Sequence, residues 1–399
     1  MPLISVRSTL LTLLLSILFC FFSAGLYAKS CEFKTVSFTT DFETGKLNSC
    51  AQLSDHHYLL TTDAENRPIN SSPWYAFKVE PKQGIKTQQI KITIQAKQTK
   101  PRYLPKMSTD SKNWQVMPFL IKDNQLTFDI TLTKKLFIAA QEIINNTQYL
   151  NWMAEISDTS DFTKINIGNS TLGLPIDGLI AQQSDNTEWL LILGRQHPPE
   201  ITGALALFSF VDELAQNHQS QQVFLDRFNV LIIPNLNPDG VAAGNWRHNS
   251  QGVDLNRDWG KFVQVETALV KAKLDSLLKK PQRIVFALDF HSTHQDIFYT
   301  MPTDYAVAPS QFSNEWLSKI KAQTVSSFVV RPKPGSSPGR GVFKQFIADE
   351  YKVHAVTFEL GDNTQRELIN HVARISAQTL VKQMLKTPPQ AFIFSTVLP

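Results

Sequence analysis

Apolar and polar residues alternate with a two-residue period in several short segments between residues 29 and about 150. The segments YAFKVEP, QIKITIQA and LTFDITL alternate in this way or concentrate β-branched and aromatic residues, and turn-forming residues separate them. Such segments are typical of β-strands joined by turns, and no strong helical period occurs before about residue 135. The pattern predicts a small all-β sandwich domain over residues 29–148.

From about residue 150, short apolar runs alternate with helical stretches such as ITGALALFSFVDELAQ. The runs are EWLLILG (188–194), FNVLIIP (228–234), RIVFALDF (283–290) and HAVTFEL (354–360). Strands alternating with helices predict a three-layer α/β/α domain with a mixed, largely parallel sheet covered on both faces. We assign residues 149–388 to this domain and residues 389–399 to a C-terminal tail.

The first 28 residues differ from the rest of the chain. Arg7 precedes an uncharged apolar run, TLLTLLLSILFCFF, and small residues follow it up to Ala28. This order is typical of a secretory signal peptide, and the run is short for a membrane span of about 20 residues. An uncleaved anchor is the alternative. We predict a secreted or periplasmic protein that begins near Lys29 and has no membrane contact after cleavage.

The composition argues against a nucleic-acid partner. The net charge is only +4, with 39 Lys+Arg against 35 Asp+Glu in 399 residues, and no dense basic block occurs. Two cysteines, Cys31 and Cys50, follow the predicted leader. In an oxidising compartment they could form a disulfide, and two separate buried thiols are the alternative.

Polar clusters follow the apolar runs, at the edge where ligands bind in open α/β sheets. His197 and Glu200 lie in GRQHPPE after one run, and His291 lies in FHSTH at the end of another. Zinc accepts imidazole and carboxylate ligands, and catalytic sites use three protein ligands plus water. We predict that these three side chains bind one Zn²⁺ per chain. His294 either lines the site or is a polar loop residue.

The segment NWRHNSQGVDLNRDW gathers Arg247, Asp254, Asn256 and Arg257 into one loop beside a strand end. Arginine binds carboxylates in a planar, bidentate way, so the loop is suited to gripping a substrate carboxylate and stabilising an oxyanion. Asp254 could orient a histidine that binds the metal. An internal salt-bridge network is the alternative.

Glu359 interrupts the apolar run HAVTFEL. A carboxylate there is costly to desolvate unless it has a partner or a chemical role. Beside zinc it could take a proton from water and pass it to a leaving amine, whereas a buried structural ion pair is the alternative.

Together, His-x-x-Glu, Arg, Asp-Leu-Asn-Arg, a strand-end His and Thr-Phe-Glu resemble the M14 family of zinc metallocarboxypeptidases over roughly residues 150–385. The resemblance implies that Glu359 is the general acid/base and that Arg247 polarises the scissile carbonyl. It also implies that Asn256 and Arg257 bind the terminal carboxylate, with Asp254 supporting the first histidine. Residues 30–150, approximately, are similar to the β-sandwich of cytosolic-carboxypeptidase-like members.

The sequence departs from the digestive members of that family at two places. Pro198 and Pro199 stand where those members carry an arginine of an outer substrate subsite. Their mobile-loop tyrosine has no counterpart in GSSPGRGVFKQF, where Phe343 cannot donate a hydrogen bond. Either Arg340 or Lys344 takes that role, or the role is absent.

Lys344 precedes Glu359 by fifteen residues, a separation at which the resembling family lines its side-chain pocket. A cation there would favour an acidic C-terminal residue, and a solvated lysine is the alternative.

We therefore predict a carboxypeptidase that hydrolyses a peptide or amide bond next to a free C-terminal carboxylate. The predicted partner is a peptide substrate, with cell-wall peptide as one candidate. An N-acyl-amino-acid deacylase of the aspartoacylase type is one alternative, and a catalytically silent peptide-binding member of the fold is another.

Overall fold

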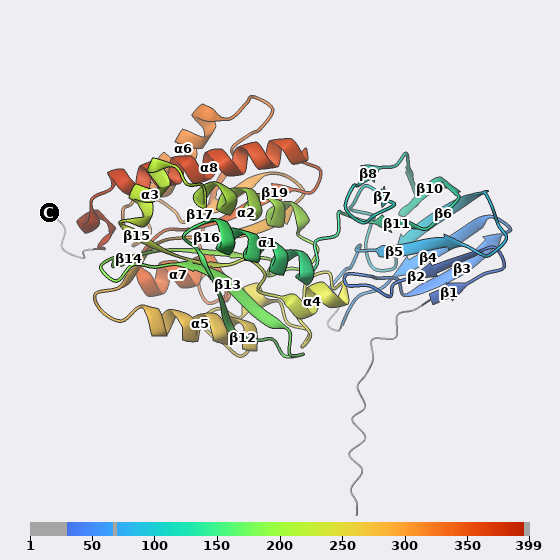
Figure 1. Cartoon of the computed structure of the whole chain (residues 1–399), viewed down its shortest axis with the longest axis horizontal. Helices are drawn as coiled ribbons and strands as arrows, with labels where there is room; N and C mark the ends of the chain where they lie inside the picture. Colours follow the sequence, from blue (N-terminus) through green and yellow to red (C-terminus); the bar gives the residue numbers. More distant parts are fainter. Residues whose placement is uncertain (1–29, 67–69, 395–399) are drawn as a thin grey trace, which may run out of the picture.

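The computed structural model describes residues 30–66 and 70–394. These residues form a β-sandwich and an α/β domain that lie side by side (Figure 1). The predicted signal peptide and its cleavage site lie outside the described residues. No helix in the described part of the chain is long and apolar enough to cross a membrane.

The β-sandwich consists of two sheets, with the strand orders β1-β2-β5-β11-β7-β8 and β3-β4-β6-β10-β9. Alternating residues of β6 and β10, among them Ile92 and Phe128, are buried between the sheets, as the two-residue period predicted. The strands are β1 (Ser30–Glu32), β2 (Val36–Thr39), β3 (Ser49–Ser54), β4 (His57–Thr62), β5 (Ala76–Pro81), β6 (Gln88–Ala96), β7 (Lys106–Ser108), β8 (Gln115–Val116), β9 (Leu120–Lys122), β10 (Gln125–Leu132) and β11 (Leu136–Ala139).

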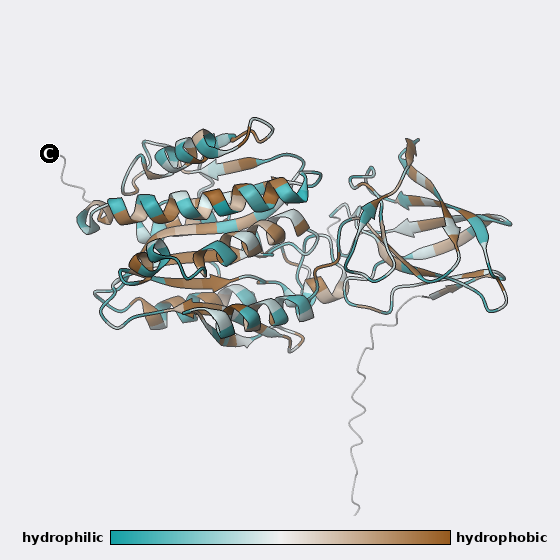
Figure 2. Ribbon diagram, turned by 45° about the horizontal axis from the view of Figure 1, so that its top comes forward, coloured by the Kyte–Doolittle hydropathy of each residue, from teal (hydrophilic) through white to brown (hydrophobic). Residues whose placement is uncertain are grey.

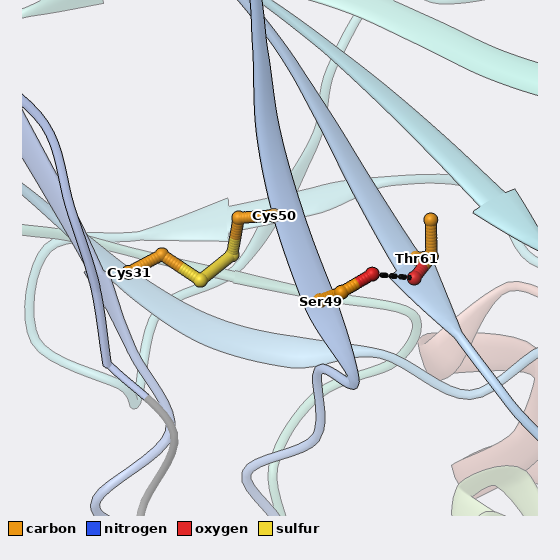
Figure 3. Close-up of a disulfide and its surroundings, with 4 residues drawn as sticks. All are labelled: Cys31, Ser49, Cys50 and Thr61. Carbon is orange, nitrogen blue, oxygen red and sulfur yellow. Dashed lines mark hydrogen bonds between the residues drawn. A yellow bond between two sulfur atoms is a disulfide. The ribbon is translucent and has the colours of Figure 1, made fainter.

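A disulfide links the two sheets of the sandwich. Cys31 on β1 bonds to Cys50 on β3, which belongs to the opposite sheet (Figure 3). The structure thus confirms the pairing that the sequence left open. The bond closes a segment of 19 residues near the start of the described chain.

The α/β domain contains an eight-stranded mixed sheet with the order β12-β13-β15-β14-β16-β19-β17-β18. The central strands β15, β14, β16 and β19 run parallel, and every residue of β14 is buried, as expected for strands covered on both faces. The strands are β12 (Thr163–Asn169), β13 (Pro175–Ala181), β14 (Glu188–Gly194), β15 (Phe228–Ile233), β16 (Arg283–Thr293), β17 (Ile297–Thr300), β18 (Pro332–Pro334) and β19 (Ala355–Gly361).

Successive residues of β14 enter two different cores. Leu190 and Ile192 pack with α1, α2, α3, α6 and α8, whereas Leu191 and Leu193 pack with α5 and α7 on the opposite face. Figure 2 shows the apolar central strands between the helices. The predicted three-layer architecture is therefore confirmed. The helices are α1 (Asn146–Thr159), α2 (Ile201–Leu214), α3 (Gln219–Leu225), α4 (Pro238–Ala243), η1 (Leu255–Arg257), α5 (Val265–Leu277), α6 (Phe312–Gln323), α7 (Phe343–Tyr351), α8 (Arg366–Lys386) and η2 (Pro389–Phe392).

Ion pairs join the sandwich to the α/β domain at the carboxyl edge of the large sheet. Arg102, in the loop between β6 and β7, binds the carboxylate of Asp362 just beyond β19. Arg366, in the first turn of α8, binds Glu142 in the segment that follows β11. The β-sandwich therefore lies beside the edge at which the sequence predicts the site.

We expect replacement of both cysteines, in a Cys31→Ala/Cys50→Ala variant, to lower the free energy of unfolding by about 3 kcal/mol. The cross-link restricts the unfolded chain, and a loop of this length has an effect of that size. Urea unfolding of the wild type and the variant measures the difference. Wild-type protein in reductant should match the variant, and equal stability of oxidised wild type and variant would contradict the prediction.

Candidate active site

Three side chains predicted to bind metal converge at the carboxyl edge of the large sheet. His197 and Glu200 lie in the turn from β14 to α2, and His291 lies near the end of β16. Their candidate ligand atoms all lie within 4.8 Å of one another. The Nδ1 atoms of His197 and His291 lie 2.8 and 2.7 Å from the two carboxylate oxygens of Glu200.

Close packing fixes the turn that carries the first two of these residues. Arg195 adopts a left-handed conformation with φ of 53°, and its buried guanidinium donates to the carbonyl of Pro198. On α2, a Cβ added to Gly203 would lie 2.5 Å from the carbonyl oxygen of His291, so only glycine permits this helix to lie so near β16. The turn is therefore held against the strand that carries His291, the third candidate ligand.

Each histidine has a second carboxylate on its outer nitrogen. Nε2 of His197 lies 2.9 Å from Asp254, and Nε2 of His291 lies 2.7 Å from Asp289. Such partners fix the tautomer and orientation of metal-binding imidazoles. Burial opposes the ionisation of Glu200, but the two imidazoles outweigh it and hold the pKa of Glu200 well below its usual range. Two inward imidazole nitrogens and one ionised carboxylate fit a zinc site.

The predicted substrate-binding loop lies beside this cluster. Arg247 donates from Nε to Asp254 at 2.7 Å, so one carboxylate contacts both the arginine and His197. Asn256 accepts a hydrogen bond from the backbone of Phe343, and Arg257 donates to the carbonyl of Asn256. The side chains of Arg247 and Arg257 are 34% and 40% exposed, respectively, so both keep donors available to a ligand.

Glu359 on β19 lies directly opposite His291 in the parallel register of β16 and β19. Burial raises its pKa, the nearby His291 opposes this shift, and Glu200 adds to it. Within the described residues the carboxylate of Glu359 accepts no hydrogen bond. A carboxylate with a raised pKa and no structural partner, next to a metal site, is suited to proton transfer.

The predicted metal ligands, the arginines of the loop and Glu359 line one cavity of about 440 Å³. It is lined by His197, Glu200, Arg247, Asn256, Arg257, His291, Lys344 and Glu359, together with residues from both domains. Among the side chains that the sequence analysis assigned to the site, Arg340 and His294 do not line the cavity and are exposed, and Asp254 does not line it either.

Lys344 is buried in the wall of this cavity rather than solvated. Its side chain donates to the carbonyl oxygens of Thr300, at 2.9 Å, and Gly335. Burial lowers its pKa to about 8. The structure therefore places the Lys344 ammonium in the cavity wall, where it also donates to the sulfur of Met301 at 3.3 Å, so all three of its donors have partners.

Several residues of the site were missed by the sequence reasoning. Asp289 is completely buried, and it could have been found because a charged residue two positions before His291 shares its strand face. Tyr299 on β17 lines the cavity, and burial raises the pKa of its phenol, with a further contribution from the charge of Glu359. Arg102 and Tyr103 line the cavity from the β-sandwich, and no pattern in the neighbouring sequence indicated that they would.

Glu65 of the β-sandwich binds the backbone of the Arg247 loop. Its carboxylate accepts from the amide groups of Trp246, Arg247 and His248, the last two at 3.0 and 2.7 Å. The side chain is only 3% exposed, and Asn70 donates to it as well. The sandwich thus determines where the backbone of Arg247 lies.

An α/β/α fold with a His–Glu–His cluster at the carboxyl edge of its sheet, and a carboxylate beside it, defines a metallohydrolase. The zinc carboxypeptidase family, peptidase family M14, matches residues 149–382, and the cytosolic carboxypeptidase N-terminal domain matches residues 38–141. This chain belongs to the zinc carboxypeptidase family. The resemblance drawn from the sequence is confirmed.

Among its relatives, mouse (Mus musculus) cytosolic carboxypeptidase 3 is 24% identical over 66% of this chain and 30% of its own length. Human (Homo sapiens) cytosolic carboxypeptidase 6 is 25% identical over 64% of this chain and 56% of its own length. This chain thus spans only part of these relatives. A metallo-carboxypeptidase from Burkholderia cenocepacia, 18% identical, shares the fold over 88% of this chain and 100% of its own, with a TM-score of 0.75.

The comparisons correct the prediction of export. Relatives such as mouse cytosolic carboxypeptidases 3 and 6, and the matching N-terminal domain, are named for the cytosol, which contradicts the prediction of a secreted or periplasmic protein. The apolar run that suggested a signal peptide lies outside the described residues. Composition alone was a poor guide here, because it reports only that a segment is short, apolar and preceded by a cation.

We expect Asp289→Asn to weaken zinc binding by about 10- to 100-fold, because His291 loses the anion that orients it. Zinc titration against a competing chelator measures this affinity. The matched control is Asp304→Asn, since Asp304 is exposed and lies away from the cavity. Unchanged affinity in Asp289→Asn, with the control also unchanged, would remove Asp289 from the site.

Proposed function

We propose that this chain is a zinc-dependent carboxypeptidase that removes the C-terminal residue of a peptide, with one zinc ion held by His197, Glu200 and His291. The observation that carries the proposal is the cluster of these three side chains beside Glu359, which pairs with His291 in the sheet, in one cavity with two partly exposed arginines. A zinc ion there supplies a Lewis acid that makes water nucleophilic near neutral pH.

The residues of the chain take the remaining tasks. Glu359 accepts a proton from the attacking water and returns it to the leaving amine, which its raised pKa favours. Arg247, positioned by Asp254, donates to the oxygen of the scissile carbonyl as negative charge develops there. Asn256 and Arg257 bind the terminal carboxylate of the substrate.

Lys344 supports a preference for an acidic C-terminal side chain. It is the buried cation of the cavity wall, and Tyr299 and Lys333 line the same cavity. A buried ammonium attracts a carboxylate and repels a second cation. Tyr299 also carries a phenol near Glu359, so it is our candidate for the hydrogen-bond donor that the loop before α7 lacks. The cavity offers no feature that favours cell-wall peptides over other peptides.

The complete set of three metal ligands and Glu359 supports an active enzyme over a silent peptide-binding protein. The order of domains also differs from the aspartoacylase type, in which the additional domain follows the catalytic one.

We expect Glu359→Gln to retain zinc and to lower kcat by at least about 100-fold, because glutamine keeps the size but cannot accept the proton. Peptide hydrolysis and elemental analysis of the same preparation measure both quantities. Glu367→Gln, at an exposed position at the start of α8, is the matched control. Wild-type turnover in Glu359→Gln would assign the base to another group.

We expect the preference for a C-terminal Glu over Leu, expressed as kcat/KM, to fall as pH rises through about 8. Lys344 is protonated below its lowered pKa of about 8 and becomes neutral above it, so the attraction for an anionic side chain is lost. Lys344→Met should show a weak, pH-independent preference, and Lys321→Met, exposed on α6, should behave as wild type. Fastest cleavage of a C-terminal Lys, or an unchanged ranking in Lys344→Met, would contradict this role.

A further inference from the structure

The β-sandwich supplies one wall of the active-site cavity. Arg102 and Tyr103, from the loop between β6 and β7, line it together with Pro199, Glu200 and Trp246 of the α/β domain. The rings of Tyr103 and Trp246 lie 6.0 Å apart in an edge-to-face arrangement, and the Arg102 guanidinium lies 4.8 Å from the Trp246 ring centre. Two domains thus build a single surface of aromatic rings and one cation.

The guanidinium of Arg102 is held rigidly in this wall. Its Nε and Nη2 donate to the two carboxylate oxygens of Asp362, at 2.7 and 3.2 Å, and the side chain is 16% exposed. Asp362 is itself fixed, because its amide donates to Thr293 and its carbonyl accepts from Gln141. Within the described residues Nη1 of Arg102 makes no hydrogen bond. A fixed guanidinium therefore retains donors for a ligand.

Arg102 and Lys344 line the same cavity but are held by different neighbours. Arg102 contacts Asp362 and Trp246, whereas Lys344 contacts Thr300 and Gly335, and the two sets share no residue. Asp362 follows Glu359 by three residues, and Trp246 immediately precedes Arg247. Arg102 therefore lies next to the elements that carry the proposed base and the carbonyl-polarising arginine.

On the proposed function, the last residue of a substrate occupies the side of Asn256, Arg257 and Lys344. The peptide upstream of the scissile bond must then leave the cavity along another wall. We propose that Arg102, Tyr103 and Trp246 form a binding subsite for this upstream segment. Nη1 of Arg102 donates to a backbone carbonyl oxygen of the substrate, and the two aromatic rings cover its side chains.

The choice of a carbonyl oxygen follows from charge. Asp362 neutralises Arg102 through a bidentate pair, so the remaining donors act more as a directed hydrogen bond than as a free cation. Aromatic faces bind side chains of any charge by apolar contact. The subsite should therefore make kcat/KM depend more on the length of the substrate than on its sequence.

The test compares an N-acetyl dipeptide with an N-acetyl tetrapeptide that has the same two C-terminal residues. We expect wild type to favour the tetrapeptide, and Arg102→Met to lower kcat/KM for the tetrapeptide by about tenfold, the effect of one charged hydrogen bond, with little change for the dipeptide. Methionine retains the apolar stem that packs on Trp246. The loss should appear mainly in KM, because the contact lies away from the reacting bond.

Glu43→Gln is the matched control. Glu43 also makes a contact across the domain interface, because its carboxylate accepts from the backbone and side chain of Asn146, but neither residue lines the cavity. It should leave the tetrapeptide-to-dipeptide ratio unchanged even if the variant is less stable. An equal loss for both substrates in Arg102→Met, or no advantage of the longer substrate in wild type, would overturn the proposal.

The binding of an uncleaved peptide separates this inference from the proposed function. If zinc-loaded wild type hydrolyses neither substrate, the proposed function fails. Calorimetry with the tetrapeptide then still compares the Kd of wild type and Arg102→Met. A Kd about tenfold weaker in the variant supports the subsite, and equal Kd values overturn it.

Discussion

One buried carboxylate between two buried imidazoles constrains much of this molecule. Burying a charge is costly unless it is paired, and Glu200 is paired on both oxygens. Each imidazole then requires its own outer anion, and those anions in turn contact Arg247 and Gln196. The groups that compensate the charge of Glu200 therefore come from three places: the end of β16, the loop after α4 and the residues that precede α2.

The sheet makes this cluster geometrically feasible. Parallel strands end at the same edge, so the turn after β14, the end of β16 and the end of β19 bring residues about 160 positions apart in sequence into contact. The register places His291 opposite Glu359, so backbone hydrogen bonds fix the separation of the third proposed ligand and the proposed base. The sheet therefore fixes the positions of His291 and Glu359, whereas His197, Glu200 and Arg247 depend on the turns and loops that follow the strands and helices.

Much of the fold was predictable, because strands with a two-residue period and fully apolar central strands leave distinct patterns. His197, Glu200 and His291 were predictable for a related reason: polar residues directly after apolar runs identify the binding edge. The contributions of Arg102 and Glu65 were not predictable, since their partners Asp362 and Arg247 lie 260 and 182 residues further along the chain. No local pattern encodes such pairs, and only the packing of the two domains creates them.

Glu65 makes a loop of the α/β domain dependent on the β-sandwich. Three consecutive amide groups, those of Trp246, Arg247 and His248, rely on a carboxylate that another domain provides. These three residues are half-buried, and a backbone donor that leaves water needs an acceptor, so the loop conformation depends on this carboxylate. The α/β domain therefore depends on the β-sandwich, and the two domains are expected to be retained together in evolution. A descendant that shed the sandwich would have to acquire, in the same step, a new acceptor for the loop that carries Arg247.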